Sequence, residues 1–97
     1  MIITDHGEER VRKRVGVPKG AVQAAAERAF ENGIKREDTS GSLRRYLDAE
    51  HHKDNANNIR VWSEKVWIFY DKRLVTVFPL PQKYRKTVEK IKRGENK

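Results

Sequence analysis

Residues 66–70, with the sequence Val-Trp-Ile-Phe-Tyr, constrain the fold of this chain more than any other segment. Their β-branched and aromatic side chains favour extended backbone. Ser63 and Glu64 before the run, and Asp71 and Lys72 after it, are suited to tight turns. Side chains of a strand point alternately to the two faces of its sheet, so a run that is apolar throughout indicates cover on both faces. The sequence therefore predicts a central, doubly covered strand.

Two further β-forming runs flank this strand. Residues 59–62 precede it, and residues 74–78 follow it and are closed by Pro79 and Pro81. Because each connection is only about two residues long, consecutive strands are expected to pair antiparallel. We predict a β-meander of three strands or more.

Helical patterns occupy the first half of the chain. Asp5, with Glu8 three residues later, has the spacing of a capping box and begins a short helix that Gly16 ends. A second helix is predicted over 18–32, and a third over 42–53. Each of the three helices is expected to have one apolar side. The residues on these sides are Val11 and Val15 in the first helix, Val22, Ala25, Ala26, Ala29 and Phe30 in the second, and Leu43, Tyr46 and Leu47 in the third. We interpret 34–41 as a loop and 54–58 as a polar turn region.

The C-terminal segment 81–97 is basic and amphipathic. Tyr84, Val88 and Ile91 have helical spacing, and residues 83–97 contain seven Lys or Arg against two Glu. This helix either docks on the sheet or is loosely held. We predict one α+β domain over 1–97, with two or three N-terminal helices packed on the meander, a core in 1–80 and a basic C-terminal helix or tail.

Composition narrows the class of partner. The chain of 97 residues has 22 Lys and Arg against 14 Asp and Glu, which gives a formal net charge of +8. Such a charge favours a polyanion: nucleic acid, with RNA favoured, or an acidic protein surface. The absence of cysteine and of a signal-peptide pattern indicates a cytoplasmic protein. No apolar run approaches the roughly 18 residues that span a bilayer, so no membrane partner is expected.

One row of residues in the first helix has the composition of a phosphate-handling site. His6, Arg10 and Arg14 are spaced by four, which places them on one helical face. Histidine transfers protons near neutral pH, and arginine binds phosphate and stabilises its developing charge. The alternative is a solvated basic face without chemistry. Thr76, inside the third predicted strand, is the fourth candidate, provided that it points toward this helix; otherwise it is an ordinary β-forming residue.

Further residues are candidates for nucleic-acid binding. Trp62 lies near a turn, where an exposed aromatic ring could stack on a base. Arg60 alternates with Ile59 and Val61 and is therefore expected on the face opposite to theirs. The complete set of predicted binding residues is Arg44, Arg45, Lys53, Arg60, Trp62, Lys83, Arg85 and Lys86. Each of the basic residues could instead serve only solubility.

Several kinds of site have no motif in this sequence. There is no glycine-rich phosphate loop, nucleophile elbow or paired-carboxylate pattern, so no nucleotide cofactor is predicted. His51 and His52 are adjacent and point in different directions on a helix. With no cysteine and no His-x-x-x-His pair, no metal site is predicted.

The order of elements resembles the barnase/EndoU/colicin/RelE-like superfamily, especially its small domains of unknown function that begin with a His-and-Arg helix. The resemblance is carried by the pattern His6-x-x-x-Arg10-x-x-x-Arg14, by Val17-Pro18 opening the second helix, and by a meander ending in Leu-Val-Thr-Val. It implies helices packed on one face of an antiparallel sheet and metal-independent RNA cleavage. His6 would then be the general acid or base, Arg10 and Arg14 would hold the phosphate, and Thr76 would be an accessory contact.

These observations predict an RNA-binding protein, in the first place a small endoribonuclease of RelE/barnase-like fold, as in bacterial toxins. The alternative is a non-enzymatic inhibitor of phage type, which would use its basic face to grip a host nucleic-acid-handling complex. A third interpretation is a dimeric adaptor, which an exposed aromatic sheet face would favour.

Overall fold

A five-stranded sheet lies at the centre of the computed structural model, which describes residues 1–54 and 58–94, and the side chains of 1–49 and 58–94. The strand order across the sheet is β1-β5-β4-β3-β2. Along the chain the strands are β1 (Ile2–Ile3), β2 (Ile34–Lys35), β3 (Asn58–Trp62), β4 (Lys65–Tyr70) and β5 (Arg73–Pro79). β1 pairs parallel with β5, and the other pairs are antiparallel.

The predicted meander is confirmed as β3, β4 and β5. Trp62 pairs with Lys65, so the connection between β3 and β4 is a two-residue turn. Both turn residues, Ser63 and Glu64, have positive φ (53° and 60°), as a type I′ hairpin turn requires. β4 is the central strand, and its residues 66–69 are buried on both faces.

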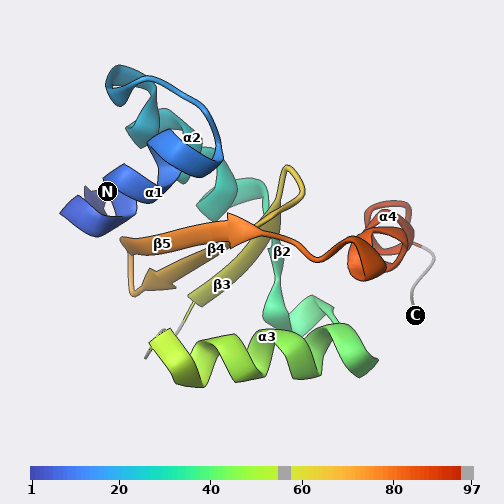
Figure 1. The fold of residues 1–97 in the computed structure, drawn as a ribbon. Helices are drawn as coiled ribbons and strands as arrows, with labels where there is room; N and C mark the ends of the chain where they lie inside the picture. The colour runs from blue at the N-terminus through green and yellow to red at the C-terminus, as the bar shows by residue number, and fades with distance from the viewer. Residues whose placement is uncertain (55–57, 95–97) are drawn as a thin grey trace.

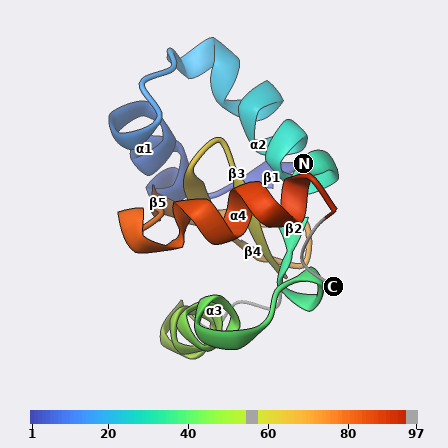
Figure 2. The same cartoon turned by 90° about the vertical axis from the view of Figure 1, so that its right-hand side faces the viewer.

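Helices cover the two faces of this sheet, as Figure 1 shows. In the described parts of the chain the α-helices are α1 (Asp5–Arg14), α2 (Val22–Asn32), α3 (Gly41–Asp54) and α4 (Arg85–Lys92). α1 and α2 lie together on one side of the sheet, α3 lies on the other, and α4 follows from the C-terminal end of β5. Figure 2 shows α4 between the α1/α2 pair and α3 in the view along that end of the sheet. The α+β class and the three N-terminal helices agree with the sequence prediction.

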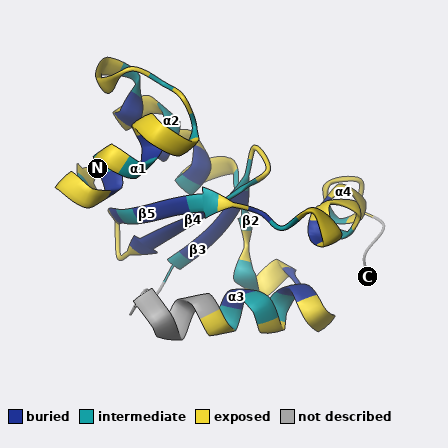
Figure 3. Ribbon diagram, viewed as in Figure 1, coloured by how far each residue is buried: buried dark blue, intermediate teal, exposed yellow. Residues whose placement is uncertain are grey.

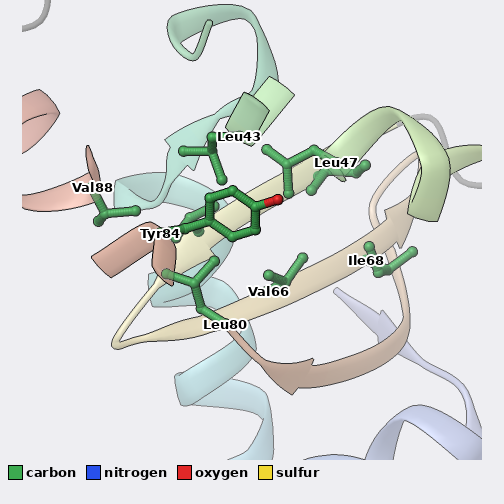
Figure 4. Packing of buried hydrophobic residues seen from close by; sticks show 9 residues of the cluster. Leu43, Leu47, Val66, Ile68, Leu80, Tyr84 and Val88 are labelled. Carbon is green, nitrogen blue, oxygen red and sulfur yellow. The ribbon is translucent and has the colours of Figure 1, made fainter. Parts of the chain in front are cut away.

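Each side of the sheet has its own core. Under α1 and α2 the buried residues are Val11, Val22, Ala26, Ala29, Trp67, Phe69, Leu74 and Val77. On the other side they are Leu43, Leu47, Ile59, Val61, Val66, Ile68, Leu80, Tyr84 and Val88. Figure 4 shows the Tyr84 ring between the leucines of α3, the strands and Val88 of α4. The resemblance implied helices on one face only, whereas this sheet is covered on both.

Two short strands were not predicted. β1 and β2 each have two residues and form the edges of the sheet. Segment 34–41, interpreted as a loop, contains β2 and a 3₁₀ turn over Arg36–Asp38. Strands this short carry no alternation pattern of their own, and the ladder bonds to a longer neighbouring strand define them.

The start of α1 differs from the predicted capping box. Thr4, not Asp5, is the N-cap, and its Oγ1 accepts a hydrogen bond from the Gly7 backbone N–H at 2.9 Å. The same hydroxyl donates to the Leu74 carbonyl at 3.0 Å. A Cβ on Gly7 would lie 2.7 Å from this carbonyl oxygen. Glycine at this position therefore lets α1 lie directly against β5.

Candidate nucleic-acid interface

The histidine–arginine row predicted from the sequence is present on α1. Arg10 Nε donates a hydrogen bond to His6 Nε2 at 3.3 Å, on the outer surface of the helix. Around it, α1 carries both signs of charge, with four Lys or Arg against three Asp or Glu over residues 5–14. Lys13 bonds Glu9 at 2.8 Å, and this bond lowers the pKa of the Glu9 carboxyl. The net positive charge of this helix is therefore small.

Arg14 has a second role in the fold. Its Nη1 donates to the Val77 carbonyl at 2.9 Å. Val77 lies on β5 beyond the two residues that pair with β1, so its carbonyl faces an otherwise unpaired strand edge. Thr4 donates to the same edge from the start of α1. α1 thus closes the edge of β5, and Arg14 helps to hold it there.

Thr76 does not join the row, which corrects the expectation that it points toward the first helix. Thr76 pairs with Ile68, whose side chain belongs to the core on the α3 side. The neighbouring pair, Trp67 and Val77, belongs to the core under α1 and α2. Paired residues in an antiparallel ladder share a face, so Thr76 points away from α1 and is only 7% exposed.

Arg60, which was predicted to bind nucleic acid, is instead buried. It is 6% exposed, and its Nε donates to the Phe30 carbonyl at 3.0 Å, near the end of α2. The guanidinium lies 4.7 Å from the centre of the Phe30 ring. Burial lowers the pKa of Arg60, while the carboxylates of Glu37 and Asp38 act in the opposite direction. Arg60 is thus a structural residue that joins β3 to α2.

Trp62 is not the exposed aromatic residue of the sheet. It is half-buried against the core under α1 and α2. Among the described residues, the large exposed hydrophobic side chains are Ile2, at 63%, and Tyr70, at 47%. Tyr70 is the last residue of the apolar run, and its position beside a turn was the sequence signal for exposure.

The predicted residues on α3 divide into three cases. Arg44 is half-buried, and its Nη2 donates to the Glu37 carbonyl at 2.8 Å. Arg45 is exposed. Lys53 lies outside the residues whose side chains are described, as do His51 and His52. Of the two predicted binding residues on α3 whose side chains are described, Arg45 is therefore the exposed one.

The densest positive surface lies on α4 and the turn before it. Residues 83–93 contain six Lys or Arg and one Glu. The six cations are all exposed: Lys83, Arg85, Lys86, Lys90, Lys92 and Arg93. In Figure 3 the outer turns of α4 are exposed, whereas its inner side contains buried residues. We call these six residues the α4 basic face.

The apolar side of α4 fixes this face on the folded domain. Tyr84 and Val88 are 8% and 4% exposed, and Ile91 packs against the same core. The segment is therefore docked on the core. Exposed ion pairs involve Arg85, 3.8 Å from Glu64, and Lys92, 4.0 Å from Glu89. Lys86 and Lys90, one turn apart, make no ion pair with a described residue.

The comparisons with known proteins do not assign this chain to a family. No family model matches it, and no curated protein and no solved structure is similar enough to count as a match. In the described parts of the chain, no helix is both long and apolar enough to cross a membrane. Nor do the described side chains include three or more His, Asp or Glu gathered as a metal site would need.

Proposed function

We propose that this protein binds nucleic acid, with RNA favoured, and that the α4 basic face contacts the phosphates. The observation that carries this proposal is the docked helix with six exposed cations and one carboxylate over residues 83–93. Cations on a fixed helix release condensed counterions when they neutralise phosphates, which drives binding at low salt. The mixed charges of α1 supply less attraction, so α1 is secondary in this proposal.

A charge reversal on α4 tests the proposal. Lys86→Glu with Lys90→Glu is expected to weaken binding to a fluorescein-labelled 20-nucleotide RNA at least tenfold, measured by fluorescence anisotropy. Because two phosphate contacts are lost, the slope of log K against log salt is expected to fall by about 1.4 for a single strand. Both lysines are exposed, so circular dichroism is expected to remain that of the wild type.

A matched control separates a defined surface from net charge. Lys19→Glu with Arg28→Glu changes the total charge by the same amount, and both residues are exposed near or on α2. This control is expected to weaken binding much less. Equal losses in the two double variants would contradict a role for α4, and a wild-type protein that does not bind RNA at low salt would overturn the proposal. The acidic protein surface would then be the partner to pursue.

RNA cleavage is a second candidate function, favoured by the contact between His6 and Arg10 on the open surface of α1. In such a reaction the 2′-oxygen forms a bond to phosphorus while the bond to the 5′-oxygen breaks, leaving a cyclic phosphate. One proton leaves the 2′-hydroxyl and one reaches the 5′-oxygen. His6 is the group on α1 suited to move one of them, and Arg10 would contact the phosphate.

The cleavage hypothesis makes its own prediction. RNA incubated with the protein and EDTA is expected to yield fragments with cyclic phosphate ends, and His6→Ala is expected to stop their formation. Thermal unfolding of this variant should match the wild type, because His6 is exposed. Cleavage that persists in the variant, or no cleavage by the wild type, would leave binding as the function.

A further inference from the structure

Three strands place an isoleucine, an arginine and a tyrosine in one row at the end of the sheet away from α4 (Figure 1). Ile2 of β1 pairs with Arg73 of β5, and Arg73 pairs with Tyr70 of β4. The adjacent pair, Leu74 and Phe69, belongs to the core under α1 and α2. Because neighbouring residues of a strand point to opposite faces, Ile2, Arg73 and Tyr70 point to the face of the sheet away from α1.

This row borders a hollow with apolar walls. The hollow has a volume of about 520 Å³ and is lined by Met1, Ile2, Tyr70, Asp71, Lys72 and Arg73. Ile2 and Tyr70 are 63% and 47% exposed, and neither belongs to the two cores. A half-exposed ring and an exposed isoleucine that line the same hollow give a binding molecule an apolar surface to cover.

The hollow is held in shape by the backbone around it. The turn after Tyr70 contains Asp71 at a φ of 53°, and Asn58 Nδ2 donates to the Asp71 carbonyl at 3.0 Å. On the other side, the ladder to β5 fixes Ile2. A site held in this way loses little conformational entropy when it binds.

The charges around the hollow select its ligand. Lys72 and Arg73 are exposed at its border, and neither forms an ion pair with a described residue. Asp71 is the single carboxylate of the lining. An aromatic ring with two neighbouring cations matches a molecule that has a flat π-face and attached phosphates, because bases stack on aromatic side chains while Lys and Arg neutralise the backbone.

We propose that this hollow binds an unpaired base of single-stranded nucleic acid, stacked on Tyr70, with its flanking phosphates on Lys72 and Arg73. The inference rests on the proposed function and adds the form of nucleic acid that is recognised. The α4 basic face supplies general attraction, and the Tyr70 hollow distinguishes a free base from a paired one. A base inside a duplex is already stacked on its neighbours and cannot cover the Tyr70 ring.

Tyr70→Ala tests the inference with three probes of one length: a single-stranded oligouridine, a phosphodiester chain of abasic residues, and an RNA duplex. Anisotropy is expected to show about ten- to hundredfold weaker binding of the oligouridine, the range for one stacked base. Binding of the abasic chain and of the duplex should be unchanged. Tyr70→Trp, which keeps a stacking surface, should bind oligouridine as tightly as the wild type.

The salt dependence separates this test from that of α4. Stacking releases no counterions, so Tyr70→Ala should leave the salt slope unchanged, whereas the Lys86 and Lys90 reversal lowers it. Equal binding of oligouridine by Tyr70→Ala and the wild type would overturn the base site while leaving the proposed function intact. Equal losses on all three probes would also overturn it. Failure of the wild type to bind any of the three probes would instead refute the proposed function itself.

Discussion

Replacing Trp67 with alanine is expected to lower the free energy of unfolding by about 3–5 kcal/mol, the usual loss for a buried tryptophan. Trp67 is 1% exposed at the middle of the central strand. It packs in the core with residues of α1 and α2, and its Nε1 donates to the Trp62 carbonyl at 3.0 Å. Removing the side chain therefore leaves a cavity at the contact between the sheet and both helices. Urea unfolding followed by far-ultraviolet circular dichroism measures this loss.

Trp62→Ala is the matched control, because it removes the same side chain from a half-buried place at the end of β3. Trp62→Ala should lower the free energy of unfolding by about 1–2 kcal/mol, clearly less than Trp67→Ala, because the Trp62 side chain buries less apolar surface. The stability of a small domain is only about 5–15 kcal/mol, so the loss expected for Trp67→Ala is a large fraction of the total. Similar losses in both variants would contradict the central position of Trp67.

Gly33→Ala is expected to lower the free energy of unfolding by about 1–3 kcal/mol, as overpacking does in a core. Gly33 follows the last residue of α2, and its φ of −67° and ψ of 155° are open to any residue. The constraint is space. A Cβ would overlap the Ala29 carbonyl and lie 2.8 Å from the Arg60 Cβ, and both neighbours are fixed by buried contacts. The measurement is urea unfolding of the purified variant.

Gly20→Ala provides the comparison for this prediction. Gly20 has no positive φ, and nothing lies within 4 Å of a Cβ built on it. Alanine there restricts the unfolded chain without a clash, so stability should stay unchanged or rise by about 0.4–1 kcal/mol. If Gly33→Ala proved as harmless as Gly20→Ala, the close approach of α2 and β3 would be refuted.

The two proposed contact regions divide recognition between opposite ends of the sheet. In the proposal, the α4 basic face would attract phosphates of any nucleic acid, and salt would weaken this attraction. The Tyr70 hollow would add an interaction that requires an unpaired base and does not depend on salt in the same way. A single-stranded nucleic acid that occupied both regions would have to pass along the surface of the domain between them. Recognition of single strands would then come from stacking, and most of the affinity from charge.

Local pattern was sufficient for most of the secondary structure. Apolar spacing predicted α2 over 18–32 and α3 over 42–53, close to the observed Val22–Asn32 and Gly41–Asp54. Uninterrupted β-forming residues predicted the meander and the double cover of β4. These features depend on neighbours within a few positions along the chain, where the 3.6-residue and two-residue periods are directly visible.

Only tertiary structure decided which side chains of those elements are available for function. Thr76 was expected to point toward the first helix, but Val77, its neighbour on β5, is the residue buried under α1 and α2, and Thr76 lies on the other face. Arg60 was visible as a cation, yet the end of α2 buries it. Ile2 and Tyr70 line one hollow because β1, at the start of the chain, pairs with β5, which in turn pairs with β4. The charge and periodicity of this protein are local properties, whereas burial and the meeting of distant residues arise only when its helices and strands pack together.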